Sequence, residues 1–276
     1  DTIQGKTTAQ IVEALLRKQN LTNITIYAPS GLCMASTESF SSGIDELIVW
    51  LQETIPPLKE YKYKIYFNLV GSFKSLQGYL NTIGMFYADE IIYIFEGEKS
   101  DLITIPRLPI SVDTSLIKPY IMQLALLNSG IGLSPQQTAG IPETMLGEID
   151  GKMTLSTWGQ LIWNQCKEEL LSGDLIPFSR LEYQDTFRAD YNKVKEKHKR
   201  VKLQETLATV TGLLNESNGD TAILRQHGGI QYDRYVNKDN IDHFRVTQDT
   251  RVSNTISQGK LILRRYGLEP EVNNNP

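Results

Sequence analysis

The feature that most constrains the fold of this chain is an apolar, β-type run that stops at a Gly-Ser pair and gives way to a helical pattern. Residues 63–69 have the composition of a strand. Gly71 and Ser72 end this run, and the residues after them show apolar side chains at helical spacing. This order predicts a strand, a tight turn and a helix N-terminus. Unpaired backbone N–H groups and the helix dipole favour an anion at such a junction, and Lys74 adds a positive charge. A phosphate group is therefore the expected ligand.

We expect a ligand site around this turn. Asn68, at the carboxyl end of the strand, is placed to read a sugar hydroxyl or a base edge, and Gly71 lets the backbone come close to a ligand. The expected ligand-binding residues are Asn68, Gly71, Ser72, Phe73 and Lys74, with Ser30 and Gly31, which follow an earlier predicted strand, in second rank. The alternative is structural: Gly71 serves the turn, Ser72 caps the helix and Lys74 is solvated.

The elements around the turn are predicted to alternate between helix and strand. A helix capped by Thr7 or Thr8 comes first, and a strand at 23–28 and a helix at 41–54 follow it. After the turn and its helix, residues 90–95 form a continuous apolar run that is typical of a buried strand. Strands that alternate with amphipathic helices predict a parallel, doubly wound sheet, whose ligands lie beyond the carboxyl ends of the strands.

Three motifs in this region carry a resemblance to a known family. They are Asn-Leu-Val-Gly-Ser-Phe-Lys-Ser (68–75), Gly-Met-Phe-Tyr-Ala-Asp-Glu-Ile-Ile-Tyr-Ile-Phe-Glu (84–96) and Ile-Pro-Arg-Leu-Pro-Ile (105–110). They resemble the CARF domains of CRISPR-associated effectors, over about residues 1–110. The resemblance implies a Rossmann-like sensor that binds a cyclic oligoadenylate, cyclic tetra-adenylate or cyclic hexa-adenylate, across the axis of a homodimer.

The turn departs from the family pattern at two positions. That pattern is Asn-x-Thr-Gly-Gly-x-Lys, and here Val70 and Ser72 replace the Thr and the second Gly. The departures keep Asn68 and Lys74 but put in doubt any contact of the missing hydroxyl. In the family a first strand with a loop rich in Thr, Gly and Ser precedes this region, so we expect the sequence to lack the N-terminal strand of the domain.

Charge divides the chain into two parts. From Ile176 onward there are 16 Lys/Arg against 13 Asp/Glu, whereas the preceding part has 12 against 19, so the later part is where RNA or DNA would bind. The two cysteines have no metal-ligand spacing and are expected to be buried thiols in a reducing compartment. No apolar run approaches the length of a membrane span. We therefore expect a cytoplasmic protein with no membrane partner.

Three domains are expected within an α/β fold class. They are the ligand-sensing domain at 1–112, a helical connector at 113–178 and a small α+β domain at 179–276. In the connector, helical patterns cover 115–128 and 143–172, and a winged-helix-like form is left open.

The predicted α+β domain combines a basic helical hairpin with an antiparallel sheet. After a short strand at 181–187, seven Lys or Arg fall within residues 188–202, and a second helix is predicted to join near 200–202. This density is typical of polyanion binding, with a solvated helix as the alternative. The expected RNA-binding residues are Lys195, Lys199, Arg200 and Lys202. Strands are predicted at 232–236, 243–246, 251–256 and 261–265, with a hairpin turn at 257–260.

Arginines recur along these strands, near one histidine and one tyrosine. The candidate catalytic residues are His243, Arg245, Arg251, Arg264, Arg265 and Tyr266, and strand alternation places members of the set on one sheet face or at its edge. Such a set suits RNA cleavage by its own 2′-hydroxyl, because arginines stabilise charge on the phosphorus while His243 or Tyr266 moves protons. The alternative is that the arginines only hold RNA phosphates or pair with Asp242 and Asp249.

The C-terminal region carries a second, less specific resemblance. Its motifs are the basic hairpin at 183–215, Ala-Ile-Leu-Arg at 222–225, His-Phe-Arg-Val-Thr at 243–247, Thr-Arg-Val-Ser at 250–253 and Leu-Ile-Leu-Arg-Arg-Tyr at 261–266. They look like the RelE toxins, over about 181–276. The family implies a metal-independent, cofactor-free mRNA endoribonuclease that acts in the ribosomal A site and leaves a 2′,3′-cyclic phosphate.

The resemblance implies roles for individual residues. Arg251 matches the family's Arg after the mid-sheet turn, and Arg245 falls where the family has a basic residue one strand earlier. Arg264 or Arg265 falls at the late strand-end Arg. Tyr266 lies closer to the last strand than the terminal catalytic Tyr of some members.

Together the resemblances predict a cyclic-oligoadenylate-activated endoribonuclease of type III CRISPR defence that cuts mRNA on the ribosome. HEPN ribonucleases, the more usual partners of CARF sensors, need Arg and His four to six residues apart on one helix, a spacing that the sequence lacks. Two alternatives remain open. One is a ligand-responsive DNA-binding transcriptional regulator without nuclease activity, and the other is a ring nuclease that degrades cyclic oligoadenylate with Lys74 at the scissile phosphate.

Overall fold

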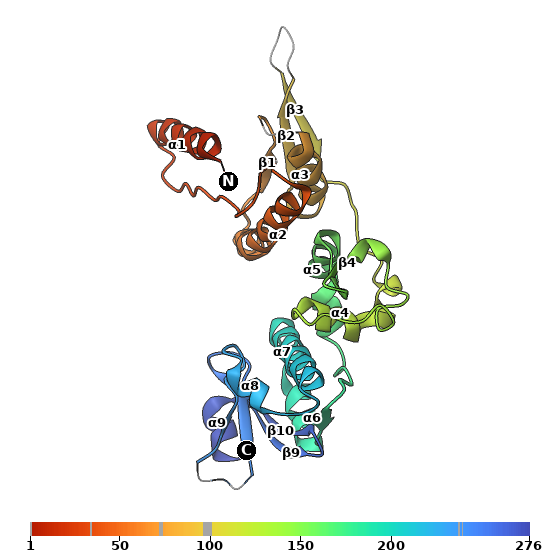
Figure 1. Cartoon of the computed structure of the whole chain (residues 1–276). Coiled ribbons are helices and arrows are strands. Elements are labelled where there is room, and N and C mark those ends of the chain that lie inside the picture. The colour runs from red at the N-terminus through yellow and green to blue at the C-terminus, as the bar shows by residue number, and fades with distance from the viewer. Residues whose placement is uncertain (1, 34, 72–73, 96–100, 237, 239) are drawn as a thin grey trace. The chain divides into compact units, whose positions relative to one another are not determined.

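The computed structural model describes residues 2–33, 35–71, 74–95, 101–236, 238 and 240–276. The chain divides into two compact units, Asp1–Ser111 and Val112–Pro276, each of which is described by itself (Figure 1). Both contain helices and sheets, which confirms the predicted α/β fold class. None of the described helices is both long enough and apolar enough to cross a membrane.

Within its described residues, the N-terminal unit holds a three-stranded sheet and three helices. In chain order these are α1 (Ile3–Lys18), α2 (Thr37–Glu60), β1 (Tyr66–Asn68), α3 (Lys74–Tyr87), β2 (Glu90–Ile94) and β3 (Leu102–Pro106). Strands β1 and β2 run parallel, as the pattern predicted. Strand β3, which was not predicted, pairs antiparallel with β2. The described sheet therefore has one parallel and one antiparallel pair.

Two predictions for this unit are wrong. Residues 23–28 do not form a strand; instead the Tyr27 ring stacks on Trp50 of α2, with ring centroids 4.6 Å apart. The N-cap of α1 is Thr2, whose hydroxyl accepts a hydrogen bond from the Gly5 amide. The hydroxyls of Thr7 and Thr8 donate to backbone carbonyls one turn back, because both residues lie inside the helix.

The core of this unit fixes α2 and α3 beside the sheet. Ile44 and Ile48 of α2 and Ile83 of α3 are fully buried, and Ile91 of β2 packs with Leu69, directly after β1. Figure 1 shows α3 next to β1 and β2. This packing orients the turn between β1 and α3, where the expected ligand site lies.

The C-terminal unit is built around a five-stranded sheet. Its helices are α4 (Ile121–Asn128), α5 (Thr157–Leu171), α6 (Asp185–Lys193), α7 (Lys197–Glu216), α8 (Ala222–Gln226) and α9 (Glu269–Asn274). Its strands are β4 (Leu146–Ile149), β5 (Lys152–Leu155), β6 (Leu181–Tyr183), β7 (Asp233–Arg234), β8 (Asp242–Arg245), β9 (Thr250–Ser257) and β10 (Lys260–Leu268). The sheet order is β6-β10-β9-β8-β7. Among the strands that the structure describes there, β6 pairs parallel with β10 and the others pair antiparallel; β4 and β5 form a separate hairpin that was not predicted.

Helix boundaries differ from prediction at several places; the pattern at 143–172, for example, contains the β4–β5 hairpin before α5 begins. The predicted helix at 115–128 consists of 3₁₀ helices at Thr114–Leu116 and Lys118–Tyr120 followed by α4, with Pro119 in the second 3₁₀ helix. The two basic helices join at 194–196 rather than near 200–202, because Arg200 lies inside α7 and its Nε donates to the Val194 carbonyl at 2.9 Å. The hairpin turn between β9 and β10 is confirmed: Gln258 and Gly259, at its centre, both have positive φ.

One hydrophobic core runs through the C-terminal unit. Leu124 and Trp163, from the predicted connector, belong to the same buried cluster as Leu207, Phe244 and Leu261. The connector sequence and the predicted α+β domain therefore pack as one body, and the division into three domains stays a prediction.

Candidate functional site

Two hydrogen bonds hold the described residues at the start of the turn after β1. The Asn68 Oδ1 accepts a hydrogen bond from the Val70 amide at 3.2 Å, and the Gln77 Nε2 donates to the Leu69 carbonyl at 3.1 Å. Gly71 has φ +87°, but a Cβ added there would meet nothing within 4 Å, so backbone conformation and not crowding requires glycine. Lys74 is exposed in the first turn of α3. Ser72 and Phe73, also expected in the site, lie outside the described residues.

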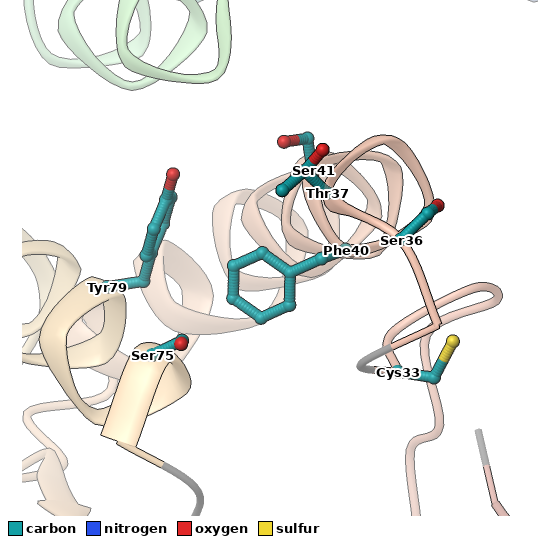
Figure 2. A pocket seen from close by; sticks show the side chains of 7 residues that line it. All are labelled: Cys33, Ser36, Thr37, Phe40, Ser41, Ser75 and Tyr79. Carbon is teal, nitrogen blue, oxygen red and sulfur yellow. The ribbon is translucent and has the colours of Figure 1, made fainter.

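A cavity of about 560 Å³ lies between the N-terminal turns of α2 and α3 (Figure 2). Its walls are Cys33, Ser36, Thr37, Phe40, Ser41, Ser75 and Tyr79. The rings of Phe40 and Tyr79 meet edge to face, with centroids 5.2 Å apart. Hydroxyls, an aromatic pair and two helix N-termini suit a ligand with both a flat ring and an anionic group.

The loop with Ser30 and Gly31 is held against α2 beside this cavity. The Ser30 amide donates to Glu46 Oε2 at 2.8 Å. A Cβ at Gly43 of α2 would lie 2.6 Å from the Leu32 Cα, so only glycine permits this approach. Cys33 is partly exposed and lines the cavity, which corrects the prediction that both cysteines are buried.

None of the described residues expected to bind ligand lines the cavity, although two of them adjoin lining residues in the sequence, and the aromatic wall was not predicted. Lys74 precedes Ser75, and Gly31 lies two residues before Cys33. Tyr79 was expected on the apolar face of α3, and nothing in the sequence shows that this face meets Phe40 across an open space.

In the C-terminal unit, strand register gathers four polar side chains on one sheet face. His243 and Arg245 alternate along β8 with the fully buried Phe244. Arg245 is paired with Arg251 of β9, and His243 with Ser253. Paired residues share a face, so His243, Arg245, Arg251 and Ser253 form one surface, which we call the arginine face.

Several polar atoms of the arginine face are buried and without a partner among the described residues. They are His243 Nδ1, Arg245 Nε, Arg251 Nε and Nη1, and Ser253 Oγ. Arg251 is only 7% exposed. Buried donors without a partner are costly, and cationic ones most of all, so an anion bound here would be stabilised.

The surroundings of His243 favour its neutral form. Burial, and then the positive charge of Arg251, lower the pKa of the imidazole from its ordinary value. The ring packs against Tyr235, with centroids 4.4 Å apart. A neutral imidazole beside two guanidinium groups can accept a proton from a hydroxyl.

Arg264, Arg265 and Tyr266 are directed elsewhere by a bulge in β10. The Arg265 Nε donates to Asp190 Oδ2 of α6 at 2.6 Å, and the Arg264 Nη2 reaches the Pro276 carbonyl at 3.4 Å. Tyr266 is buried and paired with Val252, on the face that carries Phe244. The structure thus brings His243, Arg245 and Arg251 together. Arg265 is in register with Ser253, but its side chain binds Asp190, and Tyr266 is buried on the opposite face.

The carboxylate partner of the arginine face is Glu269. Its Oε1 accepts from Arg251 Nη2 at 2.8 Å. Asp242, which the sequence offered as a partner, is fully buried and bound instead by Arg234 Nε at 2.8 Å and the Tyr232 hydroxyl at 3.0 Å. Sequence reasoning missed Glu269, because no local pattern links α9 to β9.

The predicted RNA-binding residues divide into two groups. Lys195, Lys199 and Lys202 are exposed, and Lys199 pairs with Glu196 at 2.8 Å. Arg200 is a structural residue: it donates to the Ser172 carbonyl at 3.1 Å and stacks on the Tyr191 ring.

No group of three His, Cys, Asp or Glu side chains in the described part of the chain could hold a metal ion. Cys166 is buried in α5, where burial raises the pKa of its thiol to about 12. Its thiol is therefore protonated and unreactive at neutral pH.

Comparison with known proteins finds a match for the N-terminal unit. Residues 1–108 match the family model described as CRISPR-associated protein (Cas_APE2256). No curated protein matches the chain. The matched residues cover nearly all of Asp1–Ser111, the unit that holds the cavity and the turn. This unit is therefore similar to a family of CRISPR-associated proteins.

Proposed function

We propose that this protein is a CRISPR-associated ribonuclease of type III defence that a cyclic oligoadenylate activates, with the ligand bound by the N-terminal unit and mRNA cut by the C-terminal unit. The observation that carries the nuclease is the arginine face, where Arg245, Arg251 and a neutral His243 lie together on one sheet. A bound anion would accept hydrogen bonds from its buried N–H groups, which have no partner in the described structure.

The sensor half of the proposal rests on the family match and on the cavity. Phosphates of a cyclic oligoadenylate would bind Lys74 and the α3 N-terminus, and an adenine would lie against Phe40 and Tyr79. A homodimer, which the CARF resemblance implies, would present two such sites to one cyclic ligand. The ring size, tetra- or hexa-adenylate, is left to the binding experiment.

At the arginine face the chemistry would be an in-line attack within the RNA. His243 takes the proton of the 2′-hydroxyl, whose oxygen attacks the adjacent phosphorus. Arg245 and Arg251 stabilise the added negative charge on the phosphate. The bond to the 5′ oxygen breaks, this oxygen takes up a proton, and a 2′,3′-cyclic phosphate remains. These steps need neither metal nor cofactor, and the ribosome would hold the mRNA in position.

One cleavage assay tests the nuclease. Purified protein is mixed with cyclic tetra- or hexa-adenylate and an mRNA, with and without ribosomes, in wild type, Arg251→Ala and the control Arg225→Ala. Arg225 is exposed on α8 and is not one of the four residues of the arginine face. We expect cleavage that depends on the activator and falls by about 10²-fold or more only in Arg251→Ala. Full activity in Arg251→Ala would refute the proposed site.

A binding titration tests the sensor. Lys74→Ala should weaken binding of the cyclic oligoadenylate by about tenfold, because a charge-assisted contact to phosphate is lost, whereas Lys18→Ala, at the exposed end of α1, should not. Equal affinity of the wild type and the Lys74 variant would remove Lys74 from the site. Shortened adenylates recovered from the wild type alone would favour the ring nuclease.

The charges of the predicted connector favour the nuclease over the DNA-binding alternative. Helix α5, which follows the β4–β5 hairpin, carries Glu168 and Glu169 at its exposed end, and its Lys167 is paired with Glu205 at 2.9 Å. A helix that enters a DNA groove is expected to offer unpaired cations. Tight, sequence-specific binding of duplex DNA without RNA cleavage would reverse this preference.

A further inference from the structure

Helix α9 places a carboxylate on the arginine face. Glu269, its first residue, bonds Arg251 Nη2 at 2.8 Å while the other two guanidinium nitrogens of Arg251 remain without partners in the described structure. The Arg251 side chain is 8% exposed and that of Glu269 is 41% exposed. Solvent and a competing anion can therefore reach the Glu269 carboxylate that binds the buried Arg251 guanidinium.

The remaining contacts of α9 include two further hydrogen bonds: the Glu269 amide donates to the Asp249 carbonyl at 2.8 Å, and the Asn274 carbonyl accepts from Lys238 Nζ at 3.1 Å. Val272 is buried against the unit, and the Asn273 Oδ1 accepts from the Tyr235 hydroxyl at 2.8 Å. Tyr235 in turn packs on His243. Helix α9 therefore binds Arg251 directly and is linked to His243 through Tyr235. A helix of six residues has little stability of its own and depends on such contacts. Its detachment would free Arg251 and uncover Tyr235 in one step.

We propose that Glu269 occupies, on Arg251, the position of an RNA phosphate, and that it sets the affinity of the arginine face for polyanions by competing with them. The inference rests on the proposed function, since it assigns a control residue to the same surface. One carboxylate satisfies one edge of Arg251, whereas a phosphodiester offers several oxygens to the donors that Glu269 leaves unpaired. Binding of RNA would then displace Glu269 and loosen α9.

The matched variants are Glu269→Gln and Glu271→Gln. Both remove one negative charge from α9, but in the described structure Glu271 forms no ion pair, so it controls for net charge. Glutamine keeps an oxygen that can accept from Arg251, which preserves the fold at position 269. Anisotropy of a short fluorescein-labelled single-stranded RNA, with inorganic polyphosphate as a second probe, measures affinity over a range of salt concentrations.

Glu269→Gln should bind both probes about three- to tenfold more tightly than wild type, since an ion pair of this exposure is a weak competitor. Glu271→Gln should change affinity by less than about twofold, the effect of net charge alone. The gain should disappear in the double variant Glu269→Gln/Arg251→Ala. Should that variant fail to fold, as judged by circular dichroism, Glu269→Gln/Arg245→Ala is measured instead. There the gain should persist, because Arg245 belongs to the same face but has no bond to Glu269 in the described structure.

The outcomes separate this inference from the proposed function. Equal affinities of wild type and Glu269→Gln for both probes overturn the inference, whether or not RNA is cleaved. An equal gain in Glu271→Gln also overturns it, because charge alone would then explain the effect. Tighter polyphosphate binding in Glu269→Gln without RNA cleavage under any activator upholds the competition by Glu269 and refutes the nuclease.

Discussion

At the scale of single residues, His243 links the electrostatics of the arginine face to a pH dependence. Burial and the charge of Arg251 lower its pKa. At pH values just below the ordinary pKa of histidine, the folded protein therefore binds fewer protons than the unfolded chain. Stability should therefore rise with pH through this range and fall as the solution is acidified below about 6.5. Melting temperatures measured between mildly acidic and neutral pH should decrease toward acid, and the decrease should be smaller in His243→Gln.

His198 supplies the control, because it is exposed on α7. Its replacement by Gln should leave the pH profile of the melting temperature unchanged. If RNA is cleaved as proposed, the His243 variant alone should also lose the acidic limb of the pH–rate profile, with a drop in rate of about 10²-fold or more. A profile identical to wild type in His243→Gln would remove the imidazole from the reaction.

Asp190 holds the end of β10 in place. It is 8% exposed and accepts from Arg265 Nε at 2.6 Å, from Lys193 Nζ at 3.1 Å and from the Tyr266 amide at 3.3 Å. Burial raises its pKa, but the bonds to Arg265, Lys193 and Tyr266 outweigh burial and lower it overall. Asp190→Asn should reduce the free energy of unfolding by roughly 1–3 kcal/mol in a urea titration. Asp185→Asn, at the exposed start of α6, should change it by less than about 0.5 kcal/mol.

Residues on the arginine face were predictable where local periodicity decides. A period of two placed His243 and Arg245 on one face, and the recurring arginines pointed to Arg251. Tyr266 does not follow this pattern because the bulge after Leu263 shifts the register and pairs it with Val252 on the opposite face, and the sequence alternation does not reveal a bulge. The Glu269 contact depends on tertiary packing between separate elements, which single-sequence patterns do not report.

At the scale of elements, Gln204 joins α7 to the segment that follows α5. It is fully buried, its Oε1 accepts from the Ile176 amide at 2.9 Å, and its Nε2 donates to the carbonyls of Leu171 and Asp174 at 2.8 and 3.0 Å. Gln204→Leu keeps the volume but leaves these backbone groups unsatisfied, which should cost roughly 1–3 kcal/mol of unfolding free energy. Gln226→Leu, at an exposed position of α8, is the control, and an equal cost in both variants would contradict the role of the buried amide.

Elements were predictable in proportion to the strength of their pattern. Helix α2 and strands β9 and β10 show a periodic apolar pattern over many residues and lie where expected, although α2 extends further at both ends. The segment 23–28 was mistaken for a strand because a short apolar run does not distinguish a paired strand from an extended loop packed on a helix. Strands β4 and β5 are four residues each and carry too few alternations to stand out.

At the scale of the whole molecule, the shared core decides how the C-terminal region behaves as a body. Met145 and Trp163, from the predicted connector, are buried in the same cluster as Phe187, Leu214 and Leu263. A chain cut at 178–179 would expose one half of this cluster to water. Apolar surface of that kind contributes about 25 cal/mol per Å², so the loss of the partner half outweighs the few kcal/mol by which a domain of this size is stable.

We therefore expect the fragment 112–276 to fold and the fragment 179–276 to be molten or aggregated. Near-ultraviolet circular dichroism should show fixed aromatic signals only in the longer fragment, and dye binding should report exposed apolar surface only in the shorter one. In the full chain, hydrogen exchange should protect α5 and α7 to the same depth, since they contribute to one core and open together. A shorter fragment that unfolds cooperatively, with the same protection in its sheet as in the full chain, would instead support an independent domain at 179–276, and the arginine face could then function without the connector.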